Sequence, residues 1–466
     1  MKEYYILTEP LAFLSIQDIR MREEIGEHGT LTVTGYIEDE KEEEYLARLT
    51  GEVWEKVEKA GMDGERQVLF QGIVTDFSIE SGYHQKQMTL QITTGSCLLD
   101  REEHLRAWQD SALSYEQIFD QIMGGYQDGK AVFHSPMGKT EGGLILQYHE
   151  TDWQFLKRLA SRKNQFLTAE SAGTGARVDY ALPQGHRADF PEEGKYTMRK
   201  ELETYKQKKL QGLSHLKEED SRICIVQCRE HYRIGDYMDV QGRRLYIRRI
   251  DSRLEGGEML HDCYLGTGAG MEVPRIWRDE MTGASLDAMV TKVKEDKVQV
   301  EIIGDENRGQ AADMWYRYAT IYSTKDGTGW YCMPEPGDLV RLTIPGREEG
   351  EAFVISSVHM DTDSVDRKDP AVKSFKSKYQ KEVRFTPDSI VITNNQGTKI
   401  ELTDREGVHI VSAHSVLLEA AEDITVSSDT GSLIVAGASS VNLTQGGTGI
   451  RLDKGISFNG GELKVQ

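Results

Sequence analysis

A regular repeat in the C-terminal part of the chain decides the fold. Residues 392–426 read ITNNQGTKIELTDREGVHIVSAHSVLLEAAEDITV, and the pattern runs from residue 390 to residue 452. In each unit two apolar residues flank a single residue, in the pairs Ile390/Ile392, Ile400/Leu402, Val408/Ile410, Val416/Leu418, Ile424/Val426, Leu433/Val435, Val441/Leu443 and Ile450/Leu452. Such alternation is typical of a short strand with one apolar face.

One residue from each pair measures the period of the repeat. The markers are Ile392, Ile400, Val408, Val416, Ile424, Leu433, Val441 and Ile450, and their successive spacings are 8, 8, 8, 8, 9, 8 and 9 residues. Each octad therefore predicts one strand with two inward side chains, followed by a turn rich in Gly, Ser, Asn, Thr and Asp.

Eight residues are too few for one coil of a single-chain β-helix, because closing three sides takes about two to three times as many. A lone chain would leave its strand edges unpaired and its apolar stripe in water. Three identical chains wound about one axis solve both problems, since neighbouring strands then come from the other two chains. The repeat predicts a homotrimeric needle roughly 30–40 Å long. The alternative is an antiparallel sandwich with evenly spaced hairpins.

The rest of the chain is also predicted to be mainly β, with a few helices. Period-two patterns mark strands in residues 1–100 and 171–275, and a spacing of four from Tyr45 through Leu49 and Val53 to Val57 predicts an inserted amphipathic helix over 38–61. We expect a solvated charged face on that helix, or a face that docks a neighbouring subunit.

Two further helices carry N-terminal capping signals. Ser114 with Gln117 precedes an apolar face, and Thr151 with Gln154 precedes another, on which Arg158 and Arg162 are expected to point outward. We therefore predict a mixed helical segment over 101–170. Five short strands between 283 and 360, among them 318–321, suit an OB-fold barrel, and the polar composition of 361–386 predicts a linker before the needle at 387–466.

Charge and composition exclude several classes of partner. The 466 residues carry a net charge of −21, which disfavours nucleic acid and anionic lipid. No apolar run is long enough to span a membrane and no signal peptide is recognised, so we expect synthesis in the cytoplasm. Five scattered cysteines predict reduced thiols rather than a disulfide framework.

These patterns, taken in order, resemble a known family. The string Glu150-Thr151-Asp152-Trp153-Gln154-Phe155-Leu156-Lys157-Arg158-Leu159 opens a helix, and Ile25-Gly26-Glu27-His28-Gly29 looks like an Asn-Glu-His-Gly element with Gly26 in place of Asn. In the barrel, Val298–Ile302 and Pro334–Val340 look like two further elements. With the octads, they resemble the VgrG spike proteins of type VI secretion and the hub and spike proteins of contractile phage tails.

The resemblance implies a hub of two β-barrel-like domains at the end of an inner tube, an OB-fold barrel, and a trimeric β-helix that punctures a target envelope. The implied partners are two further copies of the chain, the inner tube protein, baseplate or wedge proteins, effectors, and the target membrane during puncture. The C-terminal residues hold no His or Cys to bind a metal at the tip. We therefore expect a separate tip protein, like the Pro-Ala-Ala-Arg-repeat (PAAR-like) cone, to dock on Phe458, Leu463 and Val465.

The residues offer little for catalysis, and we expect neither an enzyme nor a cofactor. Cys224, Cys228 and His231 with His261 and Cys263 could in principle bind zinc, but their spacing favours free thiols. Glu150 and Asp152 could be imagined as an acid pair for sugar cleavage, yet both lie at a helix start, where carboxylates favour the positive end of the dipole. A cell-wall-degrading tail enzyme that uses the needle as a stalk and a receptor-binding fibre remain the alternatives.

Overall fold

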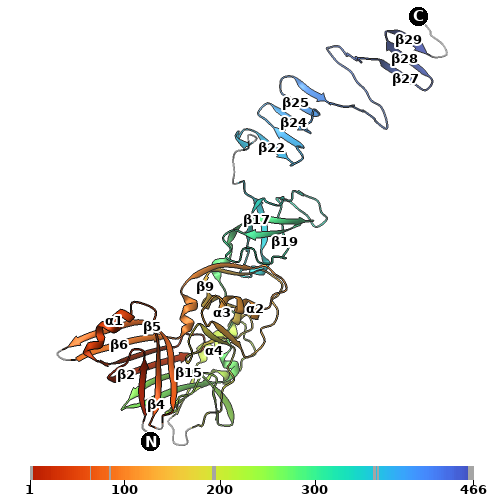
Figure 1. The fold of residues 1–466 in the computed structure, drawn as a ribbon. Coiled ribbons are helices and arrows are strands. Elements are labelled where there is room, and N and C mark those ends of the chain that lie inside the picture. The colour runs from red at the N-terminus through yellow and green to blue at the C-terminus, as the bar shows by residue number, and fades with distance from the viewer. Residues whose placement is uncertain are drawn as a thin grey trace. The chain divides into compact units, whose positions relative to one another are not determined.

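The computed structural model describes residues 4–62, 64–82, 85–190, 196–359, 364 and 367–459. The chain divides into two units, Met1–Met360 and Asp361–Gln466. Strands dominate both units, which confirms the mainly β prediction (Figure 1). In the described ranges, no helix is long and apolar enough to cross a membrane.

One sheet of eleven strands forms the base of the first unit. Its strands are β1 (Tyr4–Glu9), β2 (Ser15–Glu24), β3 (Thr30–Ile37), β4 (Trp54–Gly61), β5 (Arg66–Gly82), β6 (Gln85–Thr93), β12 (Tyr196–Lys200), β13 (Arg222–Cys228), β14 (Tyr237–Val240), β15 (Arg243–Glu255) and β16 (Glu258–Gly266). The order is β1-β4-β5-β6-β3-β2-β15-β16-β13-β12, with β14 on β15. The two β regions expected as separate domains are thus joined in one sheet, where β2 pairs with β15 from Glu24↔Arg249 to Arg20↔Arg253.

The helix predicted over 38–61 is wrong in its second half. A 3-10 turn at Asp39–Lys41 and a short helix α1 (Glu42–Arg48) come first, and Trp54–Gly61 is strand β4, between β1 and β5. A spacing of four residues fits one face of a helix, but it also fits one face of a strand because four is even. Val57 is therefore fully buried in the sheet core rather than on a helix.

The middle of the first unit is built on two helices and two small sheets. Its elements are β7 (Glu103–Trp108), α2 (Tyr115–Met123), β8 (Lys130–Phe133), β9 (Ile145–Thr151), α3 (Asp152–Ser161), β10 (Leu167–Ala169) and β11 (Arg177–Tyr180). Both capping predictions are confirmed: Ser114 and Gln117 form a reciprocal capping box, and the Thr151 hydroxyl accepts from the Gln154 amide at 3.2 Å. Further helical elements are 3-10 turns at Gly95–Asp100, Glu218–Ser221 and Asp279–Met281, α4 (Leu202–Leu210) and α5 (Gly268–Met271).

A five-stranded sheet ends the first unit. It contains β17 (Ser285–Lys294), β18 (Lys297–Ile302), β19 (Tyr316–Arg317), β20 (Leu339–Thr343) and β21 (Phe353–Ser357), in the order β19-β18-β17-β20-β21. A parallel bridge from Tyr318 to Val354 brings the two end strands together. The third strand expected at 318–321 is only two residues long and lies earlier, so Ile321 falls in an exposed connection.

The second unit begins with a five-stranded antiparallel sheet in chain order. Its strands are β22 (Lys373–Lys376), β23 (Glu382–Phe385), β24 (Ser389–Thr393), β25 (Lys399–Thr403) and β26 (Gly407–Val411). The prediction of a linker over 361–386 is therefore wrong from residue 373 onward, where β22 and β23 lie. A second meander holds β27 (Val441–Gln445), β28 (Thr448–Asp453) and β29 (Gly455–Asn459).

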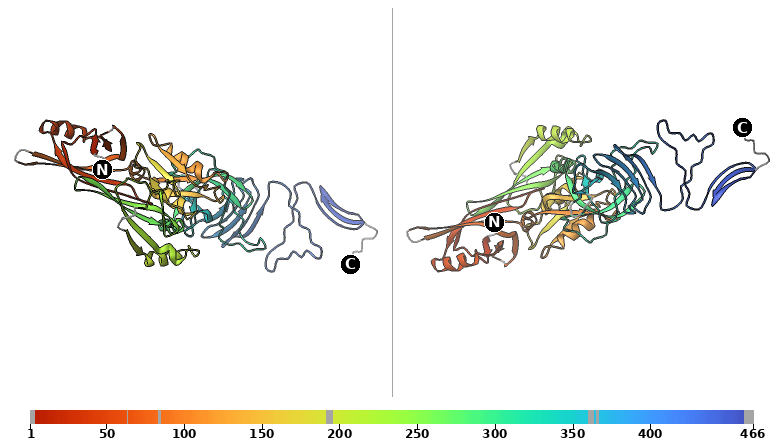
Figure 2. Two further views of the ribbon diagram at one scale, coloured as in Figure 1. Left: turned by 90° about the horizontal axis from the view of Figure 1, so that it is seen from below. Right: turned by 90° about the horizontal axis from the view of Figure 1, so that it is seen from above.

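Consecutive octads in this first sheet pair within one chain, which differs from the expectation that their neighbours come from other chains. The turn residues explain the hairpins: Asn395 and Gly397 both have positive φ, at 53° and 88°, and reverse the chain between β24 and β25. The octads between residues 412 and 440 form no strand in the structure (Figure 2).

Candidate functional site

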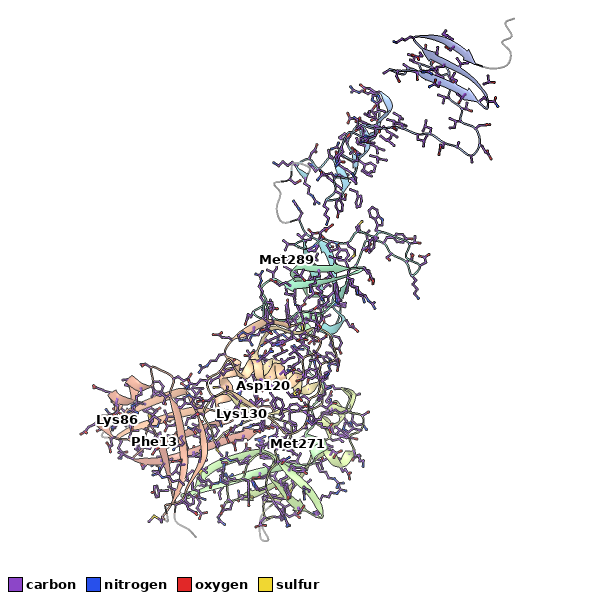
Figure 3. All side chains as sticks on the ribbon, turned by 45° about the vertical axis from the view of Figure 1, so that its right-hand side comes forward. Phe13, Lys86, Asp120, Lys130, Met271 and Met289 are labelled. Carbon is purple, nitrogen blue, oxygen red and sulfur yellow. The ribbon has the colours of Figure 1, made fainter. Side chains whose placement is uncertain are left out.

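The apolar residues of the octads lie together on one face of the first sheet. Ile392 is opposite Ile400, and Ile400 is opposite Ile410 on the next strand. Leu402 likewise lies between Ile390 and Val408. Because directly opposite residues share a face, the six side chains form one apolar surface. All six are exposed, and Figure 3 draws the side chains of the second unit on its ribbon.

The middle octads are exposed as well. Val416, Ile424 and Leu433 have exposed fractions of 54–58%. In the described part of the chain, residues 412–440 make no backbone-to-backbone hydrogen bond, so the peptide groups of these octads are open as well. An extended apolar segment with open peptide groups is a template for pairing with another chain.

The last octads repeat the arrangement of the first sheet. Val441 is opposite Leu452 and Leu443 is opposite Ile450 across β27 and β28. Leu443, Ile450 and Leu452 are exposed, and Val441 is intermediate. The structure thus brings the eight octad markers into one unit, where seven are exposed and none is buried. The expected tip-docking side chains of Phe458, Leu463 and Val465 lie outside the described residues.

The two family-like strings of the first unit contact one another. The His28 ring lies against the Trp153 ring, with centroids 4.4 Å apart, and the Lys157 ammonium donates to the Gly26 carbonyl at 3.2 Å. His28 also shares a hydrogen bond with Ser96 at 2.7 Å. Burial lowers the pKa of His28, although Asp100 opposes that change. The strings therefore form one structural joint between the β2–β3 turn and α3.

Gly26 occupies a conformation that explains its place in this joint. Its φ is +78°, in the left-handed region that glycine adopts freely and asparagine tolerates better than other residues. The string Pro334–Val340 likewise begins with a turn, which leads into β20: the Glu335 amide donates to the Asp338 carboxylate at 2.8 Å, and Gly337 has a φ of +96°. In both strings a glycine at positive φ therefore fixes the conformation of a turn.

A buried charged cluster joins α3 to the connection before β21. Arg158 donates to Glu150 at 2.6 Å and to Glu349 at 3.0 Å, and Arg162 also binds Glu349. The prediction that Arg158 and Arg162 point outward is therefore wrong. Burial alone would raise the pKa of the Glu349 carboxyl, but the two guanidinium groups bring it below its ordinary value.

Sequence reasoning missed this cluster, although α3 carried a signal for it. Trp153, Phe155, Leu156, Leu159 and Ala160 are all buried and form one apolar face of the helix. At about 3.6 residues per turn, Arg158 and Arg162 fall at the edge of this face, next to Phe155. A charged residue beside a buried face is easily buried with it, and it then needs a buried partner.

The two carboxylates weighed for catalysis bind neighbouring side chains. Glu150 binds Arg158, and Asp152 accepts from Arg106 at 2.7 Å and from the Tyr126 hydroxyl at 2.7 Å. Both carboxylates are almost fully buried.

The cysteine and histidine residues weighed for zinc lie in the core of the large sheet. The His231 and His261 rings are 5.2 Å apart, Cys228 is opposite His261, and all cysteines are free thiols. Among the described residues, no group of three or more His, Cys, Asp or Glu side chains is placed to hold a metal ion.

The chain is similar to known proteins in part of its sequence and in its fold. Residues 22–215 match the family model described as phage tail baseplate hub (GPD). No curated protein matches the chain in sequence.

Two solved structures share its fold. One is the Escherichia coli c3393 protein, a component of the type VI secretion system with structural similarity to the T4 bacteriophage tail proteins gp27 and gp5. It is 13% identical to this chain, the match covers 76% of this chain and 100% of that one, and the TM-score is 0.54. The other is a chain of the half-lidded Francisella PdpA-VgrG complex, 9% identical, covering 88% of each chain with a TM-score of 0.56. The resemblance to the VgrG and contractile-tail hub-and-spike family that the sequence motifs indicate is therefore confirmed.

Proposed function

We propose that the protein is the homotrimeric central spike and hub of a contractile injection system. In this proposal the eleven-stranded sheet and the helices above it form the hub that caps an inner tube. The five-stranded module continues the hub as an OB-fold barrel, and residues 373–459 form the shaft that punctures a target envelope.

The observation that carries the proposal is the exposed apolar surface of the octads. Burying one Val, Leu or Ile side chain stabilises a structure by about 1.5–3 kcal/mol, so leaving a whole series in water is costly. Among the described residues of their own unit, no apolar layer packs against the markers from Ile392 to Ile450. Two further copies of the same segment supply that layer by symmetry.

The strand pairing divides the proposed shaft into parts with different roles. From β22 to β26 each chain already pairs its own strands, so each copy supplies one complete face of a triangular prism. From residue 412 to residue 440 the octads have no strand partner among the described residues of their own chain, and here the three chains wind around one another. Strands shared between chains resist separation, which gives a shaft stiffness.

The topology of the five-stranded module supports the OB-fold assignment. Its order is β19-β18-β17-β20-β21, and the Ala319 amide donates to the Val354 carbonyl at 2.8 Å where the end strands meet in parallel. Five short strands closed in this way suit a small Greek-key barrel.

The partners in the proposal are the inner tube, baseplate or wedge proteins, a PAAR-like tip protein and effectors. A chain with the same fold occurs in the Francisella PdpA-VgrG complex, and this supports a role in which the spike carries other proteins. Phe458, Leu463 and Val465 are proposed to dock the tip protein. The role is structural rather than catalytic, and the binding of Glu150 and Asp152 by arginines supports that assignment.

Sedimentation equilibrium of the purified full chain tests the proposal. The expected mass is three times the 52.7 kDa of one chain. A shaft with shared strands should also keep the trimer intact in sodium dodecyl sulfate without heating. A monomer whose 373–459 segment resists proteolysis by itself would overturn the proposal, and cell-wall clearing in a zymogram would favour the enzyme alternative.

A further inference from the structure

The five-stranded module carries an exposed apolar segment between β19 and β20. Residues 320–333, here called the aromatic finger, contain Ile321, Tyr322, Trp330 and Tyr331, with exposed fractions of 93%, 51%, 53% and 73%. In Figure 1 the segment after β19 stands away from the sheet. Aromatic side chains gathered on an exposed segment are typical of an interaction site.

The aromatic finger is held in shape by its own hydrogen bonds. The Thr324 amide donates to the Thr328 carbonyl at 2.9 Å, and the Trp330 amide donates to the Tyr322 carbonyl at 2.8 Å. Hydrogen bonds from Thr324 and Thr328 lower the pKa of Asp326 to about 2, so its carboxylate stays charged. A segment ordered before binding loses little conformational freedom when it docks.

A glycine is required where the two sides of the finger meet. Gly329 has a φ of +140°, and a Cβ added there would lie 2.3 Å from the Tyr322 carbonyl oxygen. The close approach of the two sides therefore depends on this glycine, which indicates that the finger has a defined conformation.

A groove of about 770 Å³ lies elsewhere on the same unit. Its walls include Trp315, Tyr318 and Phe353. Gly143 and Gly350 also line it and touch one another: a Cβ on Gly143 would lie 2.9 Å from the Gly350 Cα. The groove volume is within the size range of ligand pockets, roughly 300–1,000 Å³, and its aromatic walls suit apolar groups from outside. No residue from 320 to 333 lines the groove.

We propose that the aromatic finger of one copy docks in the groove of the next copy around the trimer. The inference rests on the proposed homotrimer and names a contact within it. Because finger and groove are different surfaces, the contact is heterologous, and such contacts close into rings when the rotation allows. Three identical finger-in-groove contacts satisfy every finger and every groove at once.

Charges at the two surfaces support a second copy as the occupant. Lys325 is exposed on the finger, and Glu351 is exposed and lines the groove. Among the described residues neither has an ion pair within its own chain. Docking places opposite charges at the rim, where they fix orientation more than affinity.

Site-specific photo-crosslinking in the purified full chain tests the contact. The photoreactive amino acid p-benzoylphenylalanine replaces Ile321, and the matched control replaces Ile303, which is 50% exposed on the same module but outside the finger and the groove. After irradiation and denaturation in hot urea, the Ile321 variant should give products of two and three chains, mapped by mass spectrometry to residues 313–319 or 350–353. The Ile303 variant should give none at those residues.

The charge pair gives a second, independent readout. Lys325→Glu and Glu351→Lys should each lower the yield of that crosslink by about two- to fivefold, and the double variant should restore it. A crosslink confined to one chain, a crosslink mapped to other residues, or no crosslink would overturn the inference.

The mass of the same sample separates the two proposals. A trimer without the predicted crosslink removes the finger contact and leaves the proposed function standing. A monomer removes both.

Discussion

The Arg158 guanidinium donates to the Glu349 carboxylate at 3.0 Å, across 191 positions of sequence. The side chains of Arg158 and Glu349 are only 4% and 2% exposed. Arg162 binds the same carboxylate oxygen, and Glu150 binds Arg158 from the other side. The hub helix α3 and the connection before β21 are therefore tied by charges that cannot separate without remaining buried and unpaired.

Glu349→Gln should reveal the strength of this tie. Removing one charge leaves two buried arginines with less compensation, and we expect the free energy of unfolding to fall by about 3–5 kcal/mol. Urea denaturation followed by tryptophan fluorescence measures it. The neighbouring Glu348, which pairs with Arg275 at the surface, provides the control: Glu348→Gln should cost less than about 1 kcal/mol. Equal losses in the free energy of unfolding would mean that the buried cluster contributes no more to stability than the surface ion pair.

Glu55 should make stability depend on pH in a predictable direction. Burial raises its pKa from 4.5 to about 8, with Glu9 adding to the shift and the Leu11 amide opposing it. Between these values the folded chain holds a proton that the unfolded chain has lost. The free energy of unfolding therefore falls as pH rises through that window.

Glu55→Gln removes the titration while an amide oxygen can still accept from Leu11. The melting temperature of the variant, relative to wild type, should be higher at pH 8 than at pH 5. Glu52→Gln, at an exposed carboxylate paired with Arg101, should show no such trend. A difference for Glu55→Gln that is constant with pH would count against a neutral Glu55 in the folded state.

Val416→Asp should abolish the trimer that resists sodium dodecyl sulfate. The proposed packing gathers three copies of this side chain at the axis, where unpaired carboxylates are costly. Leu417→Asp places the same group one residue later, on the opposite side of a strand, and should leave the trimer intact. Gel electrophoresis without heating, together with sedimentation, measures both. An unchanged Val416→Asp trimer would contradict winding around a common axis.

Gly26 offers a test of the joint between the two family-like strings. Gly26→Asn should cost less than about 1 kcal/mol, because asparagine tolerates a left-handed backbone. Gly26→Val should cost at least about 1–2 kcal/mol, since a β-branched residue at positive φ is strained. Thermal unfolding monitored by circular dichroism compares them. Similar costs for both would show that the site relaxes to another conformation.

Local patterns predicted the elements whose signals have one meaning. The capping pairs at Ser114 and Thr151 set the starts of two helices correctly, because a hydroxyl three residues before Gln has a specific use at a helix start. Five of the eight octads form the short strand that the repeat predicts, whereas the octads of Val416, Ile424 and Leu433 do not. The spacing from Tyr45 to Val57 fits helix and strand alike, and the choice was made by pairing with β1 and β5, which no local pattern contains.

The connections between distant elements could not be predicted from the sequence alone. Nothing in the composition around Glu24 indicates that it will lie opposite Arg249 and join two β regions in one sheet. Arg158 was assigned to the surface by its charge, whereas its partner Glu349 comes from another module. The trimeric use of the octads stays a prediction, although their exposure in one chain is the condition that such an assembly requires.

The pairing of β2 with β15 bears on how the chain is made. The first strands of the sheet leave the ribosome early, but β2 has an open edge until Arg243–Glu255 has been synthesised. Such long-range pairing is slow and leaves an early intermediate open to aggregation. The octads follow the hub in the chain, so β15 is synthesised before the exposed apolar residues of the octads can meet those of another chain.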